Sequence, residues 1–293
     1  MLKREFRENI NAYLFLLPAI IVIATFSFIP IISAFVLSFC KWKILGNPEF
    51  IGLKNYLSVF TDSVFWTALK NTAYYSFTTV PAGLVLALGS ALLLNQKIKG
   101  RVFFRGVIFF PVTIAMIVIS LIWGWMFSEH YGIVNFALEK VGIAPRNWLS
   151  NPKISLPVIM VMSVWKGFGY GMVIYLAALQ SIPEVYYEAA KIDGASPWQR
   201  FWHITLPLLN PTTLFVLVVA FIGSFQVFDQ VYVLTRGGPG HATTVMVLYL
   251  YEEAFGGKYR MGRACAIAYI LFLIIMIFTI LQIKVFKEKG FER

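Results

Sequence analysis

The sequence predicts an all-α integral membrane protein with six transmembrane helices. Of its 293 residues, 59% are hydrophobic and 13% are charged, whereas a soluble domain has roughly 45–50% and 25%. Five stretches of 20 to 32 residues contain no Asp, Glu, Lys or Arg, and a sixth stretch of 30 residues contains only Lys166. A helix needs roughly 20 apolar residues to cross a bilayer, so six such helices leave no room for a soluble domain of the usual size, roughly 100–150 residues.

The first span is expected at about residues 12–39, within an N-terminal region that reaches residue 70. Its apolar run is longer than the roughly 7–15 residues of a secretory signal core, so we expect it to remain in the chain. Lys3, Arg4 and Arg7 precede it, and basic residues flank spans on the cytoplasmic side. We therefore expect the N-terminus in the cytoplasm and, with an even number of spans, the C-terminus there too.

After the first span, apolar residues recur at helical spacing in a segment expected outside the membrane. These residues are Leu53, Tyr56, Leu57, Phe60, Val64 and Ala68. The spacing predicts a surface helix, which lies either on the bilayer or a partner, or over the outer end of the bundle.

The other five spans belong to a core at residues 71–285, which is followed by a cytoplasmic tail at 286–293. They are expected at about residues 72–94, 106–127, 155–180, 208–234 and 264–285. Basic residues crowd the expected cytoplasmic flanks, namely Lys97, Lys99, Arg101, Arg105, Lys284, Lys287, Lys289 and Arg293. Orientation therefore explains most of the formal charge of +11, and we expect contact with membrane lipid but no nucleic-acid partner.

Sequence motifs indicate no bound cofactor. Cys40 and Cys265 are too few for a metal site or a disulfide framework, and we expect them to pack near span ends. The chain has no G-x-x-x-x-G-K-[ST] loop, and the cluster of Gly167, Gly169 and Gly171 lacks the strand and the acidic residue of a dinucleotide site. Those glycines predict close helix approach or a flexible point in the fourth span. We expect no metal, no cofactor and no catalytic residue in this chain.

The connection at residues 181–207 contains the signals of two short helices. Ser181 precedes Glu184 by three residues, the spacing of a capping box at a helix start. Ser196 and Gln199 repeat this spacing. The connection therefore predicts a helix-turn-helix that projects from the cytoplasmic membrane face.

Gly194 is expected to separate these two helices, because glycine readily takes the left-handed conformation that ends a helix. The second helix is expected to stop before Pro207. The first helix carries small residues between charged ones: Glu188, Ala189, Ala190, Lys191 and Asp193. Such a face lets a partner's backbone come close while its charges pair with a basic rim.

This hairpin resembles the EAA loop of ABC-importer permeases, and we call residues 181–207 the EAA hairpin. The matching run is Glu188-Ala189-Ala190, three residues, Gly194, nine residues, then Ile204-Thr205-Leu206-Pro207. The surrounding LAALQSIPEVYYEAAKIDGASPWQRFWHITLP is similar to the carbohydrate branch, the maltose and glycerol-3-phosphate type. FIGLKNYLSVF and FDQVYVLTRGGPGHAT, running on to YLYEEAF, agree with that branch.

The resemblance implies the type I ABC importer permease fold in the cytoplasmic membrane of a bacterium or archaeon. It implies a non-catalytic subunit that pairs with a second, related permease and with two ATPase subunits, which bind ATP and Mg. An extracytoplasmic solute-binding protein would deliver a sugar or oligosaccharide. With Asp193 of the charged face added, the expected ATPase joint consists of Glu188, Ala189, Ala190, Asp193, Gly194, Ile204, Leu206 and Pro207.

Lys166 and Asp229 are charged residues inside spans, where charges tend to face an aqueous cavity or a partner. With the nearby Gln226 and Gln230 they are candidates for the substrate pathway, and an ion pair or snorkelling group that sets helix packing is the alternative. A strongly anionic substrate favours several convergent hydrogen-bond donors, and the spans offer only a single cation. A neutral sugar is therefore favoured over a phosphate ester such as glycerol 3-phosphate.

Two alternatives come from other classes. An ion-coupled secondary carrier would use Lys166 and Asp229 as its relay. A membrane-embedded enzyme would need clustered His, Cys or paired carboxylates, which the spans lack. Both leave the EAA hairpin unexplained. Residues 237–240, GGPG, predict a sharp external turn, and residues 235–244 are expected to face the binding protein.

Overall fold

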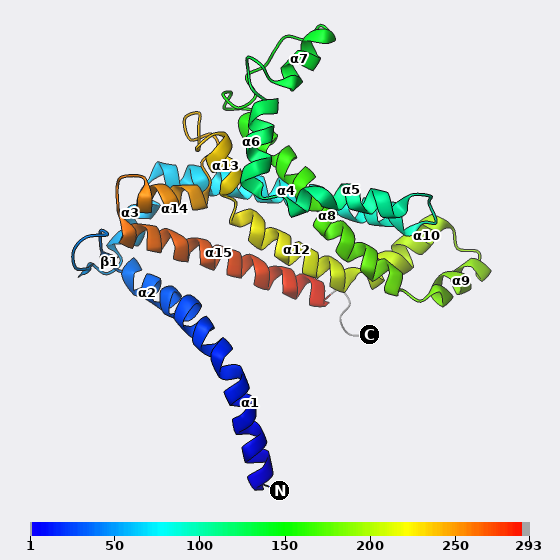
Figure 1. Cartoon of the computed structure of the whole chain (residues 1–293), viewed down its shortest axis with the longest axis horizontal. Helices are drawn as coiled ribbons and strands as arrows, with labels where there is room; N and C mark the ends of the chain where they lie inside the picture. The colour runs from blue at the N-terminus through cyan, green and yellow to red at the C-terminus, as the bar shows by residue number, and fades with distance from the viewer. Residues whose placement is uncertain (1, 289–293) are drawn as a thin grey trace. The chain divides into compact units, whose positions relative to one another are not determined.

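A computed structural model describes the backbone of residues 2–288 and the side chains of residues 13–286. The described chain is helical apart from its connections and one pair of two-residue strands. It divides into two compact units, one made of the chain up to Asp62 with Leu250–Ile270, the other of Ser63–Tyr249 with the chain from Leu271 onward. Figure 1 shows their elements in chain order by colour.

Within the described residues, five helical segments are long and apolar enough to cross a membrane. They are Tyr13–Ser38, Ser63–Asn95, Ser155–Ser181, Asn210–Leu234 and Met261–Phe286. A sixth candidate is a pair of helices, α5 (Arg101–Thr113) and α6 (Met116–Met126), with a bend of 97° between them. The predicted class is confirmed, but the third predicted span, residues 106–127, is not one continuous helix.

The first unit begins with three helical elements in direct succession: α1 (Leu2–Ile23), the π-helix η1 (Ala24–Phe28) and α2 (Ile29–Ser38). The last of them ends at Ser38, close to the end expected for the first span. It then contains β1 (Cys40–Lys41) paired antiparallel with β2 (Glu49–Phe50), α3 (Lys54–Phe60), the end of α14 (Met246–Phe255) and the start of α15 (Met261–Glu288). Both cysteines are free, and Cys40 is buried. The predicted tail extends past α15, and residues 289–293 lie outside the described residues.

The surface helix predicted through Ala68 is shorter than expected. It ends at Phe60, and Val64 and Ala68 belong to α4 (Ser63–Asn95). The Thr61 hydroxyl donates hydrogen bonds to backbone carbonyls of the preceding turn, and such bonds compete with helix continuation. Apolar periodicity continues across this interruption, so the pattern alone does not reveal it.

A buried ion network holds the first unit together. Arg263 lies between Glu253, 3.4 Å away, and Asp62, 2.6 Å away. Lys258 and Arg260 approach the same Glu253 carboxylate at 2.7 Å and 3.7 Å. The Glu253 side chain is 0% exposed and that of Arg263 is 10% exposed. The network therefore joins the segment after α3 to the end of α14 and the start of α15.

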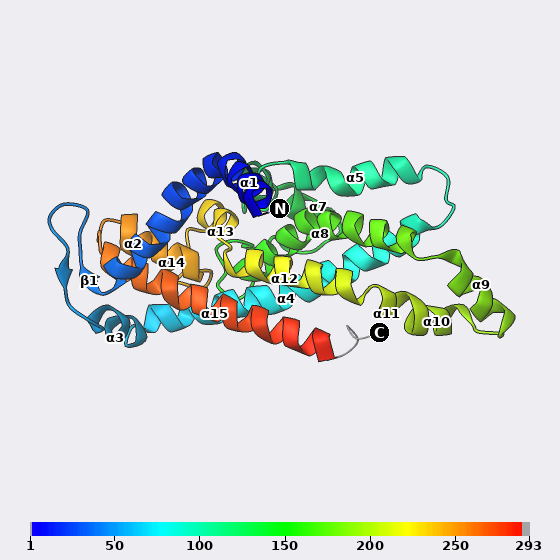
Figure 2. The same cartoon turned by 90° about the horizontal axis from the view of Figure 1, so that it is seen from below.

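In the second unit, α4, α8 (Ser155–Ser181) and α12 (Asn210–Phe225) pack side by side, with α5 along α8 (Figures 1 and 2). Two of the three clustered glycines of α8 permit this packing, as predicted. A Cβ on Gly169 would collide with the Ile108 carbonyl of α5, and a Cβ on Gly171 would lie 3.0 Å from that of Ala87 on α4.

The break between α5 and α6 consists of Ile114 and Ala115, both with extended ψ angles near 139°. Carbonyls in the last turn of a helix lack a partner within the helix. Lys166 of α8 supplies one, because its Nζ donates to the Val112 carbonyl over 3.3 Å. Beyond α6 lie α7 (Ile133–Lys140) and, later in the chain, α13 (Asp229–Leu234).

The sharp turn predicted at residues 237–240 is present. The peptide bond between Gly238 and Pro239 is cis, and the Thr243 hydroxyl donates to the Gly238 carbonyl. Asn71 of α4 donates from its amide to the His241 and Thr244 carbonyls at 3.0 and 2.9 Å. This loop is therefore fixed to α4.

Candidate functional site

The EAA hairpin consists of α9 (Glu184–Ile192) and α10 (Pro197–Arg200). The first predicted capping box is wrong, because Pro183 is the N-cap of α9 and makes no side-chain cap. Ser181 instead ends α8, and its hydroxyl donates to the Ala178 carbonyl at 2.8 Å. Ser181 therefore belongs to the end of α8, whereas its spacing to Glu184 had assigned it to the start of α9.

The turn between the two helices has the geometry predicted for Gly194. Its φ is +79°, in the left-handed region. Gly194 N–H donates to the Lys191 carbonyl at 3.1 Å, and Ala195 N–H donates to the Ala190 carbonyl at 2.8 Å. These two bonds make a Schellman motif, which fixes the direction in which the chain leaves α9.

The second capping box, between Ser196 and Gln199, is confirmed by both of its hydrogen bonds. The expected stop before Pro207 is wrong. The chain continues through the π-helix η2 (Phe201–Thr205) and α11 (Leu206–Leu208) toward α12. A π-helix shifts the hydrogen-bond register by one residue, as the bond from Leu206 N–H to the Phe201 carbonyl illustrates, so a proline can follow without ending the helix.

A pair of hydroxyls braces the hairpin, and sequence reasoning missed it. Tyr187 Oη of α9 lies 2.9 Å from Thr205 Oγ1 of η2. Thr205 is buried, with 5% of its surface exposed. Thr205 belongs to the Ile204-Thr205-Leu206-Pro207 run of the motif, but nothing in the sequence pairs it with Tyr187.

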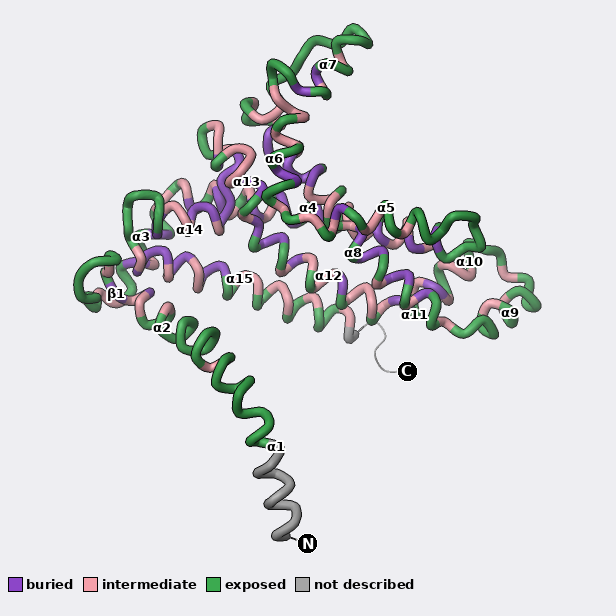
Figure 3. Tube along the Cα trace, viewed as in Figure 1, coloured by how far each residue is buried: buried purple, intermediate pink, exposed green. Residues whose placement is uncertain are grey.

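The predicted joint residues lie together on this hairpin. Glu188, Ala189, Asp193 and Gly194 are exposed, and no residue of α9 is buried (Figure 3). Large apolar side chains are also exposed here, namely Val185, Tyr186, Ile192, Trp198 and Trp202. Ile192 is 86% exposed. A charged face with apolar side chains beside it is typical of a protein-protein contact surface.

The second unit contains a half-open cavity of about 280 Å³ between α4, α8 and α12, with Met116 of α6 and Gln230 of α13 in its wall. Its lining is mostly apolar. The polar lining residues are Tyr75, Thr79, Tyr170, Ser163, Ser224 and Gln230. Such a lining, with a few placed polar groups, is typical of a small-molecule site.

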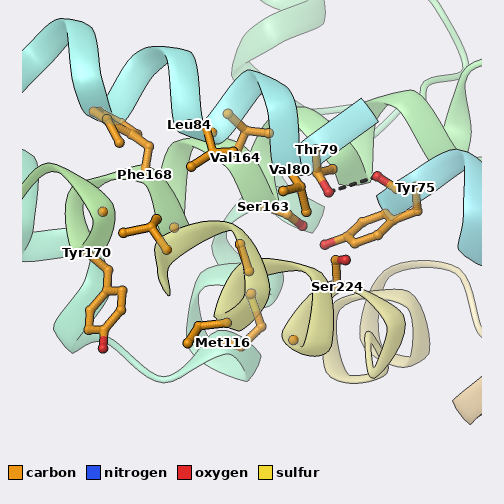
Figure 4. Close-up of a pocket in the computed structure, with 18 of the residues that line it drawn as sticks. Tyr75, Thr79, Val80, Leu84, Met116, Ser163, Val164, Phe168, Tyr170 and Ser224 are labelled. Carbon is orange, nitrogen blue, oxygen red and sulfur yellow. Dashed lines mark hydrogen bonds between the residues drawn. The ribbon is translucent and has the colours of Figure 1, made fainter. Parts of the chain in front are cut away.

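Three of these polar residues converge at one end of the cavity. Gln230 Nε2 donates to Tyr75 Oη at 2.9 Å and to Ser163 Oγ at 3.3 Å. Figure 4 shows Tyr75 and Ser163 with their hydroxyls close together. Tyr75 and Gln230 are 4% and 6% exposed. Sequence reasoning named Gln230 but not Tyr75 or Ser163, because neither residue carries or adjoins a charge that would mark it.

The other three candidate pathway residues do not line this cavity. Gln226 and Asp229 are exposed. Lys166 is half-buried and points toward the end of α5. Of the four candidates, the structure therefore brings only Gln230 into the cavity.

Comparisons with known proteins agree with this architecture. The family described as "Binding-protein-dependent transport system inner membrane component" matches residues 79–289. The chain is 38% identical to the trehalose/maltose transport system permease protein MalF of Thermococcus litoralis, over 97% of this chain and 96% of that one. It is 36% identical to the lactose transport system permease protein LacF of Rhizobium radiobacter, over 98% and 97%.

A solved structure is similar along nearly its whole length. It is a chain of a bacterial ABC transporter involved in the import of the acidic polysaccharide alginate, with a TM-score of 0.86 and 25% identity over 98% of both chains. A second match, with a TM-score of 0.85 and 25% identity over 95% of this chain and 94% of that one, comes from the alginate transporter in complex with an alginate pentasaccharide-bound periplasmic protein.

Proposed function

Because this chain belongs to the family of binding-protein-dependent transport system inner membrane components, we propose that it is the permease subunit of an ATP-driven importer for a sugar or oligosaccharide. The names of its relatives support the substrate class, since two of them transport trehalose and maltose or lactose. The proposed location is the cytoplasmic membrane of a bacterium or archaeon.

The observation that carries the coupling part of the proposal is the rigid, exposed EAA hairpin. Its turn at Gly194 is fixed by two backbone bonds, and Tyr187 and Thr205 brace it over 2.9 Å. Rigid, exposed and braced against the base of a spanning helix, it can transmit force from a partner. The proposed partner is an ATPase subunit, which binds ATP and Mg, while this chain performs no catalysis.

The remaining proposed partners complete an importer. A second, related permease carries an equivalent hairpin, so that two ATPase subunits engage two permeases. An extracytoplasmic binding protein delivers the solute, as the periplasmic protein in the alginate complex suggests. ATP binding closes the ATPase pair, draws the hairpins together and shifts the permeases from inward-open to outward-open, and hydrolysis resets them.

The coupling assignment is tested by Glu188→Lys in the complex purified from its own cells. We expect the variant to insert normally but to lose most of its associated ATPase or ATP-driven uptake, because the substitution reverses a charge on the exposed face. Glu139→Lys on α7, where Glu139 is also exposed, makes the same charge change away from the hairpin and should leave both unaffected. Wild-type uptake by Glu188→Lys contradicts the assignment.

The substrate assignment is tested with proteoliposomes that contain the whole complex and its binding protein. We expect ATP-dependent uptake of a neutral sugar and none of glycerol 3-phosphate. Uptake driven by an ion gradient without ATP would instead identify a secondary carrier. Preference for glycerol 3-phosphate would keep the importer and overturn the substrate class.

A further inference from the structure

Three glycines in the cavity wall have no neighbour within the described part of this chain that requires glycine. Gly83 lies on α4, Gly167 on α8 and Gly223 on α12, and all three line the cavity. A Cβ built on any of them meets no heavy atom within 4 Å. They differ in this from Gly169 and Gly171 of the same helix α8, where a Cβ meets a neighbouring helix.

Backbone conformation does not require these glycines either. Each lies inside a regular α-helix, where glycine is a poorer helix former than alanine. A glycine at these positions leaves free the space that an alanine methyl group would occupy. Because the three glycines line the cavity from three different helices, the absent methyl groups make the cavity wider.

The cavity is also lined by a polar side chain whose amide hydrogens are both used within the protein. Gln230 is 6% exposed, and both hydrogens of its amide are donated, to Tyr75 and to Ser163. The Ser163 hydroxyl in turn donates to the Ile159 carbonyl. Within the described part of the chain no hydrogen bond reaches Gln230 Oε1, and Gln230 lines the cavity. This oxygen is therefore free to accept a hydrogen bond from a hydroxyl of a sugar in the cavity.

We propose that Gly83, Gly167 and Gly223 set the width of the solute passage, while Gln230 Oε1 accepts a hydroxyl of the sugar held there. This inference rests on the proposed function, because it assigns the cavity to the transported solute. The volume of about 280 Å³ is slightly below the range of ligand pockets, roughly 300–1,000 Å³. The passage therefore discriminates between sugars by their size. In a cavity this small, one added methyl group takes up a substantial part of the free volume.

The test uses Gly83→Ala, Gly167→Ala and Gly223→Ala in the reconstituted complex with its binding protein. The probes are glucose, maltose, maltotriose and lactose, with ATP-dependent uptake measured for each. We expect uptake of the bulkiest accepted probe to fall roughly tenfold, since one methylene in a pocket changes discrimination by 10–200-fold, while the smallest accepted probe changes less than about twofold. Gly89→Ala on α4 is the matched control, because Gly89 is equally open but does not line the cavity.

A second variant tests the hydrogen bond, and a second measurement guards against misfolding. Gln230→Glu keeps the shape and the acceptor but loses the donors to Tyr75 and Ser163, whereas Gln230→Met removes both. We expect Gln230→Met to raise the KM for every accepted probe, while the assembled complex elutes from size-exclusion chromatography as the wild type does. If the wild type shows ATP-dependent uptake but the glycine variants lose uptake of all probes equally, the width assignment is overturned and the proposed function stands. Lack of ATP-dependent uptake by the wild type overturns the proposed function, and this inference with it.

Discussion

Replacing Glu253 by Gln should destabilise the first unit. The side chain is 0% exposed and accepts ion pairs from Lys258, Arg260 and Arg263. The side chains of Lys258 and Arg260 are 52% exposed, and exposed pairs contribute only about 0–1 kcal/mol each. The decisive partner is Arg263, whose guanidinium is 10% exposed, because a buried charge that loses its partner is strongly destabilising.

Breaking a buried ion pair costs about 3–5 kcal/mol. We place Glu253→Gln at about 3 kcal/mol, the lower end of that range, because Arg263 keeps its 2.6 Å contact with Asp62 and glutamine can still accept one hydrogen bond. For a chain of this size about 1 kcal/mol corresponds to roughly 2–4 °C. The expected fall in the melting temperature is therefore roughly 6–12 °C.

The assay is thermal unfolding of the detergent-solubilised complex, followed by size-exclusion chromatography after heating. Glu139→Gln, an exposed carboxylate on α7, is the control and should melt with the wild type. Glu253→Leu combined with Arg263→Met removes both charges and should cost less than the two single changes added together. A melting temperature for Glu253→Gln within about 1 °C of the wild type, well below the expected shift, would refute the reasoning.

Two further predictions concern the hairpin and the helix break. Tyr187→Phe removes the hydroxyl that contacts Thr205 over 2.9 Å, a loss of about 1 kcal/mol; solute imported per ATP hydrolysed should fall, while Tyr186→Phe, at an exposed neighbour, should change nothing. Lys166→Met removes the donor to the Val112 carbonyl, which should lower the melting temperature without changing the KM for the sugar. Lys166→Arg should restore it, and a raised KM in Lys166→Met would place the lysine on the solute path instead.

Composition predicted where long apolar helices lie, because apolarity is a property of all the residues of such a helix. The span expected at 155–180 is the helix Ser155–Ser181. The same property conceals the break at Ile114 and Ala115, since the residues on both sides are equally apolar. The direction of the chain changes there without any change in hydropathy.

The predicted capping box forms where no preceding helix extends over its first residue. Ser196 and Gln199 form their box, whereas Ser181 is taken by the preceding spanning helix. Contacts between distant segments left no signal at all. The pairing of Asp62 with Arg263 joins residues far apart in the chain, and no spacing rule connects them.

The cavity residues illustrate a third limit. Asp229 and Gln230 are adjacent, and the charge drew attention to the first, which is exposed, while the second lines the cavity. Neighbouring helical residues point about 100° apart, since a helix has 3.6 residues per turn. Because a span is apolar on all sides, its sequence does not reveal which face points inward. The sequence therefore identified the segment that contributes to the cavity, but not which of its residues faces the cavity.

The absence of a stop at Pro207 has a mechanical consequence. From Pro197 to Phe225 the backbone is helical except at Leu209, so the hairpin and the cavity wall at Gly223 are parts of one lever. At 1.5 Å per residue, the distance from Pro197 to Gly223 is about 39 Å, and a tilt of about 5° at one end moves the other by about 3 Å. A small tilt at the hairpin therefore displaces the cavity wall at Gly223 by about 3 Å, roughly the size of the methyl group that glycine lacks.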